Sequence, residues 1–291
     1  MKTRGWTACV LVGLLVMGCS AKESPGEQAA SDVEDARKAL ASVTPSVASA
    51  EPSERVSAPP QPAVLTKNPL YRAGRLPAAR CKAPRYAVTS VATARTFYTE
   101  LLRCMNKAWQ PVIRKAGFTF QPPKLVVTNG QSPSSPCEFA DGQAYYCHGT
   151  ISMDAAPDLA GMELQPVSTK IWMAFNFGHE YGHHVQVLTG MLEANYERGL
   201  TLNGVEVALE ESRRVELQAS CLSGVFLGAD RASIPVTADW RERYQSIVGT
   251  GNDPERDHGS PKNHERWSLA GLDAADPAAC NTYVAASAQV S

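Results

Sequence analysis

The sequence predicts an α+β fold that is mainly helical with a small sheet. Two long segments, residues 168–188 and 205–228, carry apolar side chains suited to buried helices, and short runs at 124–128 and 150–153 indicate strands. The 291 residues are 44% hydrophobic with a formal net charge of -1, which suits one globular domain with attached segments. Because the charge is near neutral, the chain has no electrostatic footprint for nucleic acid, and we expect no nucleic-acid partner.

The start of the chain has the pattern of an export signal. Two basic residues precede an apolar run over residues 6–17 that is too short for a membrane span. The sequence Val16-Met-Gly-Cys19 then resembles a bacterial lipobox, in which the cysteine is lipidated and becomes the mature N-terminus. We therefore expect residues 1–18 to be a lipoprotein signal peptide, with an ordinary signal peptide as the alternative. The lipid on Cys19 would hold the protein in the bacterial cell envelope, at the outer membrane, its periplasmic face or the cell surface.

Residues 19–68 are predicted to be the lipidated cysteine and a disordered tether. From Cys19 to about residue 66 the chain is rich in Ala, Ser, Pro and charged residues and has no aromatic residue, so it cannot bury a core. A flexible chain of about 45 residues reaches roughly 35–40 Å. The folded domain is then expected over residues 69–291.

The domain is predicted to begin with a helix and a small sheet. Apolar side chains recur at helical spacing over about 91–116, where Pro111 is expected to kink the helix and Gly117 to end it. Residues 124–128 are predicted to form a strand, and residues 145–153 to form another strand or hairpin arm.

The most informative stretch is a His-Glu-x-x-His sequence inside the predicted helix over 168–188. Residues four apart lie on one face of a helix, about 6 Å apart along its axis, so His179 and His183 can each give a nitrogen to one zinc ion. Glu180 can reach a water on the open side of that metal and take its proton as the water attacks a carbonyl. A chance match on an ordinary core helix is the alternative.

A third zinc ligand is expected from the second long helix. Gly178 and Gly182 lie beside the two histidines although each glycine costs a helix roughly 1 kcal/mol, which indicates that something approaches this backbone closely. Glu216 lies between apolar residues, and its neighbours at helical spacing are small: Ser212, Ala219, Ser220 and Ser223. We expect this small face to pack against the glycines and to bring Glu216 to the metal, leaving a fourth position for water. A partly exposed acid is the alternative.

Cysteine usage agrees with export. Apart from Cys9 and Cys19, six cysteines remain, and an even number in an oxidising compartment implies disulfide bonds. Six cysteines permit fifteen connectivities. We expect the pairs Cys81–Cys104, Cys137–Cys147 and Cys221–Cys280, of which the middle pair is the safest locally because it closes a short polar loop.

Four separated blocks of sequence together resemble the bacterial putative neutral zinc metallopeptidases. In order, they are His179-Glu-Tyr-Gly-His-His-Val-Gln186, Glu216-Leu-Gln-Ala-Ser-Cys-Leu-Ser-Gly224, His258-Gly-Ser260 with Arg266-Trp267, and Asp276-Pro-Ala-Ala-Cys-Asn-Thr282. The resemblance covers roughly residues 85–283. It implies a zincin-like metallopeptidase fold in which both histidines and Glu216 bind one Zn²⁺, and it supports the pairs Cys137–Cys147 and Cys221–Cys280.

The chain departs from the family pattern at Ser220, where the pattern has Asp. One turn after the third ligand, an Asp could orient a zinc-bound histidine, whereas serine can hydrogen-bond but brings no charge. Metal affinity or activity would then be weaker, with no ligand lost.

We therefore expect zinc-dependent hydrolysis of peptide bonds in a peptide or protein substrate, with Glu180 as general base and later proton donor. His258, in a loop before a glycine, is our candidate for stabilising the developing oxyanion, and Tyr244 is a competing candidate. Two alternatives remain: a binding or structural zincin-like lipoprotein with little catalysis, and a metal-dependent hydrolase with another substrate, such as cell-wall peptide.

Overall fold

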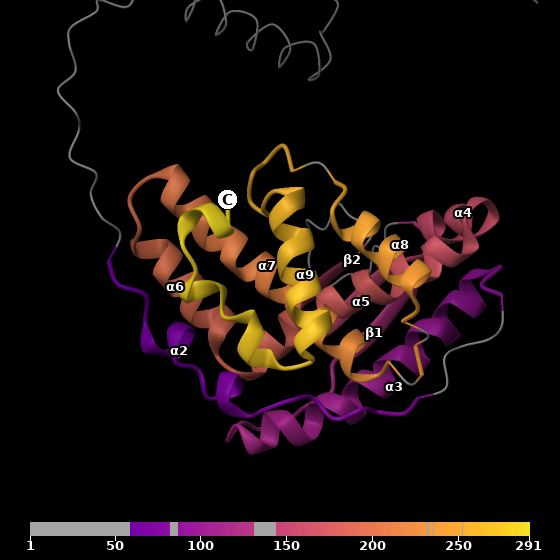
Figure 1. The fold of residues 1–291 in the computed structure, drawn as a ribbon, viewed down its shortest axis with the longest axis horizontal. Helices are drawn as coiled ribbons and strands as arrows, with labels where there is room; N and C mark the ends of the chain where they lie inside the picture. Colours follow the sequence, from indigo (N-terminus) through magenta and orange to yellow (C-terminus); the bar gives the residue numbers. More distant parts are fainter. Residues whose placement is uncertain (1–58, 82–86, 131–143, 232, 235, 252) are drawn as a thin grey trace, which may run out of the picture. The chain divides into compact units, whose positions relative to one another are not determined.

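The computed structural model describes residues 59–81, 87–130, 144–231, 233–234, 236–251 and 253–291 (Figure 1). The helices are α2 (Ala63–Thr66), α3 (Val91–Lys115), α4 (Ala155–Leu164), α5 (Pro166–Leu188), α6 (Met191–Thr201), α7 (Val205–Ala229), α8 (Ala238–Val248) and α9 (Pro261–Ala274), with short 3-10 helices η1 (Pro69–Arg72), η2 (Pro277–Cys280), η3 (Thr282–Val284) and η4 (Ser287–Gln289). The strands are β1 (Lys124–Thr128), β2 (Ala144–Cys147) and β3 (Thr150–Asp154). The predicted class, mainly helical with a small sheet, is confirmed. Within these ranges, no helix combines the length and the apolar character needed to cross a bilayer.

The three strands form one mixed sheet in the order β1-β3-β2. β3 runs parallel to β1 and antiparallel to β2. His148 and Gly149, both at positive φ, connect β2 to β3, as a two-residue hairpin turn requires. Of the two possibilities expected over residues 145–153, a further strand or a hairpin arm, the structure has the hairpin.

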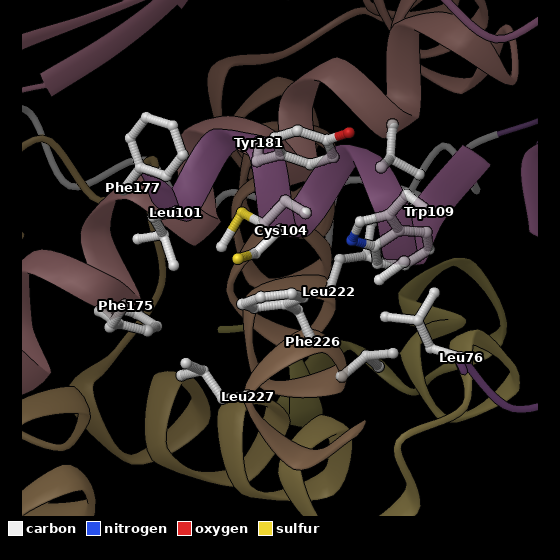
Figure 2. Packing of buried hydrophobic residues seen from close by; sticks show 14 of the residues in the cluster. Leu76, Leu101, Cys104, Trp109, Phe175, Phe177, Tyr181, Leu222, Phe226 and Leu227 are labelled. Atoms are coloured by element: carbon white, nitrogen blue, oxygen red, sulfur yellow. The ribbon is translucent and has the colours of Figure 1, made fainter. Parts of the chain in front are cut away.

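Helix α3 contributes a large part of the core, as its spacing of apolar residues predicts. It begins after Ser90, whose hydroxyl accepts a hydrogen bond from the Thr93 backbone N–H, and it ends before Gly117 at φ 91°. Pro111 lies inside this helix and does not end it. Figure 2 shows the buried side chains that meet here, among them Leu101, Cys104 and Trp109 of α3, Phe175, Phe177 and Tyr181 of α5, and Leu222, Phe226 and Leu227 of α7.

The packed chain begins before the expected boundary at residue 69. Leu65 in α2 is fully buried, and Arg198 of α6 donates hydrogen bonds to the carbonyl oxygens of Pro59 and Pro60 at 2.6 and 3.2 Å. These contacts involve residues 59–68, whose composition resembles that of the predicted tether before them. Composition alone therefore places the boundary too late.

Helices α4 and α6 are absent from the sequence-based prediction. The side chain of Asp154 accepts a hydrogen bond from the Ala156 backbone N–H at the start of α4, and α6 follows Gly190 at φ 73°. Both helices are short and lack a long apolar pattern, and no side chain caps the start of α6. Helix α5 begins at Pro166 rather than at Ser168, because proline is well suited to the first position of a helix.

Helix α5 contacts the sheet through β2 and β3 and packs closely against α7, which in turn packs against α9. A Cβ atom at Gly182 would lie 2.7 Å from the carbonyl oxygen of Ala219 and 2.8 Å from its Cα, and one at Gly178 would collide with the Ser223 side chain. The expected approach of the small-residue face of α7 to the two glycines is confirmed. It sets the distance between the two helices.

Replacing Gly182 by Ala is expected to destabilise the fold by about 1–3 kcal/mol, because the added methyl group meets backbone that cannot rotate away. Gly199 in α6 is a matched control, since a Cβ there meets no atom within 4 Å and alanine is the better helix former. Chemical denaturation of both variants tests the prediction. If Gly182→Ala were as stable as Gly199→Ala, the two helices would not be in backbone contact.

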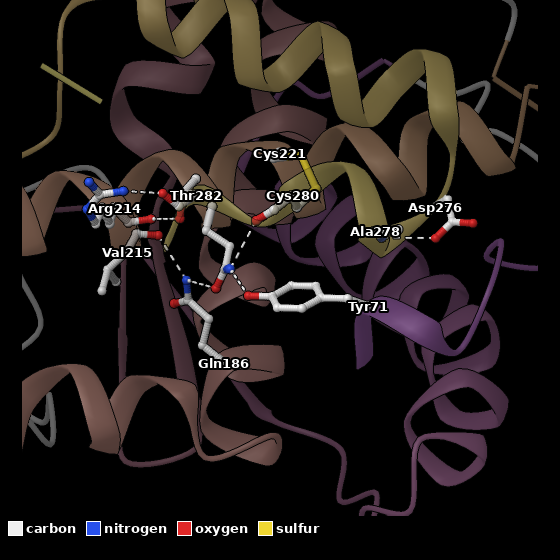
Figure 3. The surroundings of a disulfide bond; sticks show 10 residues. Tyr71, Gln186, Arg214, Val215, Cys221, Asp276, Ala278, Cys280 and Thr282 are labelled. Atoms are coloured by element: carbon white, nitrogen blue, oxygen red, sulfur yellow. Dashed lines mark hydrogen bonds between the residues drawn. A yellow bond between two sulfur atoms is a disulfide. The ribbon is translucent and has the colours of Figure 1, made fainter. Parts of the chain in front are cut away.

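The disulfides Cys81–Cys104 and Cys221–Cys280 are present as predicted. The predicted pair Cys137–Cys147 includes Cys137, which lies outside the described residues. Figure 3 shows the bond from Cys221 to Cys280, which ties α7 to η2.

A hydrogen-bonded network beside this bond ties α7 to α5. Gln218 donates to the Cys280 carbonyl oxygen and to the Tyr71 hydroxyl at 3.0 and 2.8 Å. Gln186 of α5 donates to the Val215 carbonyl oxygen and to the Gln218 side chain at 2.9 and 3.0 Å. Because these contacts flank Glu216 in the sequence, they hold its part of α7 in one register against α5.

Candidate metal centre

Helices α5 and α7 bring the side chains of His179, His183 and Glu216 together. The Nε2 atoms of the two histidines are 3.1 Å apart, and the Glu216 Oε2 atom lies 3.0 Å from that of His179 and 3.3 Å from that of His183. A tetrahedral zinc ion with bonds of about 2.1 Å separates its ligand atoms by roughly 3.4 Å. Two imidazoles and one carboxylate at this spacing fit one zinc ion.

The charges around this centre favour a cation. Burial alone would raise the pKa of Glu216, but the two neighbouring imidazoles hold that pKa well below its usual range. Burial alone would lower the pKa of His183, but the carboxylates of Glu216 and Glu180 raise it. The raised pKa of His183 favours its protonated form in the metal-free centre, so a metal ion that binds this imidazole would release a proton.

The second nitrogen of each histidine has a partner that fixes the orientation of its ring. His183 Nδ1 lies 2.9 Å from Gln186 Oε1, and His179 Nδ1 lies 2.9 Å from Ser220 Oγ. When both Nε2 atoms bind a metal ion, each Nδ1 atom carries the ring proton and donates a hydrogen bond to its partner. Ser220 thus lies behind His179, one of the candidate ligands, as the sequence predicts.

Sequence reasoning missed two residues of this surrounding layer. Gln186 follows His183 by three residues on the same helix, so helical spacing could have identified it. His264 of α9 lies with Nδ1 3.1 Å from Ser220 Oγ, and no local pattern connects it to a residue so distant in the sequence.

Glu180 lies beside the three residues and has a free carboxylate. Its exposed fraction is 6%, and within the part of the chain that the structure describes no group forms a hydrogen bond with that carboxylate. Burial raises the pKa of Glu180 more strongly than the imidazoles of His179 and His183 lower it. A carboxylate with a raised pKa is a better proton acceptor near neutral pH.

His258 comes to the edge of the centre from the loop between α8 and α9. Its Nε2 atom lies 4.0 Å from Glu216 Oε2, and its Nδ1 atom lies 2.6 Å from Asp257 Oδ1. Burial alone would lower its pKa, but Glu216 and Asp257 raise it, which favours the imidazolium. The side chain is 58% exposed and therefore accessible to a ligand.

Tyr244 does not reach the centre. Its side chain is fully buried, with its ring 5.9 Å from that of Phe175 and 5.1 Å from that of Trp240. The competing assignment of Tyr244 as the group that stabilises an oxyanion is therefore wrong, because its hydroxyl lies in the core.

His184, next to His183 in the sequence, faces the sheet. Its Nε2 atom donates to the Gln121 carbonyl oxygen at 2.7 Å, and its Nδ1 atom lies 3.0 Å from the Tyr146 hydroxyl. These bonds orient α5 against β2, so His184 has a structural role.

A cleft adjoins the centre. It has a volume of about 300 Å³, and its lining includes His258, His264, Phe175, Trp172 and Ile247. A second hollow of about 400 Å³ shares Trp172 and Ile247 with it and continues to residues of α4. The two hollows therefore follow the first half of α5 toward the candidate metal centre.

The comparisons with known proteins agree with this geometry. A family model described as "Putative neutral zinc metallopeptidase" matches residues 73–283. The uncharacterized protein YpfJ of Escherichia coli (strain K12) is 28% identical over 210 residues, which cover 65% of this chain and 71% of YpfJ. The uncharacterized protein Rv2575 of Mycobacterium tuberculosis is 28% identical over 131 residues, which cover 37% of this chain and 43% of Rv2575. No solved structure matches. Since the family match spans most of the chain and includes the whole candidate centre, the chain belongs to the putative neutral zinc metallopeptidase family.

Proposed function

We propose that the protein hydrolyses peptide bonds with one zinc ion held by His179, His183 and Glu216. The observation that carries this proposal is the convergence of two Nε2 atoms and one Oε2 atom within 3.0 to 3.3 Å, from two helices in backbone contact. Zinc, when bound, acts as a Lewis acid that polarises a carbonyl group and lowers the pKa of water.

Glu180 acts as the general base in this proposal. Its carboxylate accepts a proton from the attacking water, holds it while the carbon–nitrogen bond breaks, and delivers it to the leaving amine. Three observations support this role: the residue adjoins the ligands, its pKa is raised, and no described group competes for the carboxylate.

His258 donates a hydrogen bond from Nε2 to the substrate carbonyl oxygen as negative charge develops there. Asp257 orients the ring from the other side through its contact with Nδ1 at 2.6 Å. The exposure of the side chain and its position at the edge of the centre support this role.

The substrate is a peptide or an unfolded segment of a protein. The two hollows along α5 offer an extended path to the centre, and Trp172, Phe175 and Ile247 give that path an apolar wall. Such a wall accommodates the side chains of a substrate while backbone groups reach the metal.

We place the protein at a membrane of the bacterial cell envelope, attached by a lipid on Cys19. The sequence Val16-Met-Gly-Cys19 and the aromatic-free stretch after it support this location. A Cys19→Ser chain is expected to move from the membrane fraction to the soluble fraction in cell fractionation. Retention of the variant with membranes would exclude the lipid anchor.

Metal removal tests the proposed activity. Purified protein is expected to contain one zinc ion per chain by elemental analysis and to cleave a fluorescently labelled unfolded protein. Treatment with a chelator should abolish cleavage, and added zinc should restore it, because no residue of the centre supplies a Lewis acid by itself. Cleavage that survives complete zinc removal would contradict the proposal. One bound zinc without cleavage would favour the binding lipoprotein.

A further inference from the structure

We propose that His264 is a positioning residue of the metal centre and acts on His179 through the hydroxyl group of Ser220. Two short contacts link the three side chains: His179 Nδ1 lies 2.9 Å from Ser220 Oγ, and Ser220 Oγ lies 3.1 Å from His264 Nδ1. The inference rests on the proposed zinc site. Its test measures zinc affinity, so it stays separate from the question of peptide hydrolysis.

When zinc is bound, these two hydrogen bonds have only one possible donor-to-acceptor direction. His179 uses the lone pair of Nε2 for the metal, so its proton is on Nδ1 and is donated to Ser220 Oγ. The Ser220 hydroxyl then has its own proton to donate, and the His264 Nδ1 atom is the acceptor within reach. The result is a relay from His179 through Ser220 to His264.

His264 is in the protonation state that this direction requires. Burial, followed by the nearby His179 imidazole, lowers the pKa of His264 to about 4. The ring is therefore neutral near neutral pH, and Nδ1 is free to accept when the ring proton is on Nε2. Geometry and charge thus agree on the role of His264 as an acceptor.

Ser220 needs such an acceptor to hold His179 in place. A serine inside a helix can turn its hydroxyl toward a backbone carbonyl one turn earlier, where it does not orient a neighbouring ring. A fixed acceptor selects the rotamer in which the proton points to His264 and a lone pair points to His179. Hydrogen bonds arranged in series also strengthen one another.

The fold holds His264 firmly enough for this task. Its residue lies in the first turn of α9, where its backbone N–H donates to the Ser260 carbonyl oxygen at 3.0 Å. Helices α9 and α7 are in backbone contact at Gly224 and Gly271, where an added Cβ would collide with the facing helix. Because α7 carries both Glu216 and Ser220, the contact with α9 fixes a ligand and the group that orients another ligand.

The relay explains how His179 can be oriented although residue 220 is a serine and not an aspartate. A neutral serine–histidine pair orients His179 as a carboxylate would, but it places no negative charge behind the ring. His264 also lines the cleft beside the centre.

The test measures the zinc dissociation constant of the full chain by competition with a chromophoric chelator. The variants are Ser220→Ala, His264→Leu, the double variant and His264→Asn, whose side-chain oxygen can replace Nδ1 as an acceptor. Lys262→Ala, at an exposed position of the same helix, is the control. Thermal unfolding of the metal-free proteins shows that each variant folds.

We expect Ser220→Ala and His264→Leu each to weaken zinc binding by about 10- to 100-fold, as loss of a group that orients a ligand does. The double variant should match Ser220→Ala within about twofold, because the two residues act as one unit. His264→Asn and Lys262→Ala should bind like the wild type.

Three results would overturn the inference: unchanged affinity in His264→Leu, a loss in the double variant equal to the product of the single losses, or a loss in His264→Asn as large as in His264→Leu. Each of these three results is compatible with a protein that binds zinc and cleaves peptides, so none of them would contradict the proposed function. Conversely, if the variants showed the expected zinc affinities but the wild type cleaved no peptide, the role of His264 would be supported and the peptidase activity would be excluded. A wild type that binds no zinc would exclude both.

Discussion

Replacing Glu180 by Gln is expected to lower kcat/KM for peptide cleavage by about 10²- to 10⁴-fold and to leave one zinc ion bound. Glutamine has the size and shape of glutamate, so the packing around this nearly buried residue is preserved. Its amide cannot take a proton from water or pass one to the leaving amine. The loss should therefore appear in kcat, because the groups that bind zinc and substrate remain.

The matched control is Glu197→Gln, the same substitution at an exposed position of α6. It should leave both zinc content and kcat/KM unchanged. If Glu180→Gln cleaved peptides as fast as this control, another group would be the general base. If it lost zinc as well, its effect would have to be assigned to the metal centre rather than to proton transfer.

Replacing Glu216 by Ala is expected to weaken zinc binding by more than about 100-fold, because a ligand contributes more than a residue that only orients one. The substitution removes the negative charge that lies 3.0 and 3.3 Å from the two histidine nitrogens. Two neutral imidazoles remain, and they cannot offset the charge of the cation. Competition with a chelator measures the affinity, and elemental analysis measures the zinc that remains.

Glu206→Ala is the control for this variant, since Glu206 belongs to the same helix and, among the residues that the structure describes, its carboxylate pairs only with the exposed Arg256. Such pairs contribute at most about 1 kcal/mol to stability, so this variant should fold and bind zinc normally. Equal zinc affinity in Glu216→Ala and Glu206→Ala would remove Glu216 from the ligand set. Circular dichroism of both metal-free proteins separates loss of a ligand from loss of the fold.

The sequence by itself determined the features that depend on neighbours along the chain. His179 and His183 share a helix face because they are four residues apart, and the periodicity of α3, α5 and α7 is visible without any tertiary contact. The glycines of α5 and the small residues around Glu216 also predicted the approach of two helices, because only small side chains permit it.

Only the tertiary structure decided which residues surround these candidate ligands. The burial of Tyr244, the partners of Gln186, and the contact of His264 with Ser220 depend on how helices pack, and that packing is set by contacts between residues far apart in the chain. The same holds for residues 59–68, whose composition predicts a tether but whose contacts with α6 place them in the domain. Periodicity records which face of a helix is buried, whereas the partner of a buried polar group depends on the register between helices, which no local pattern contains.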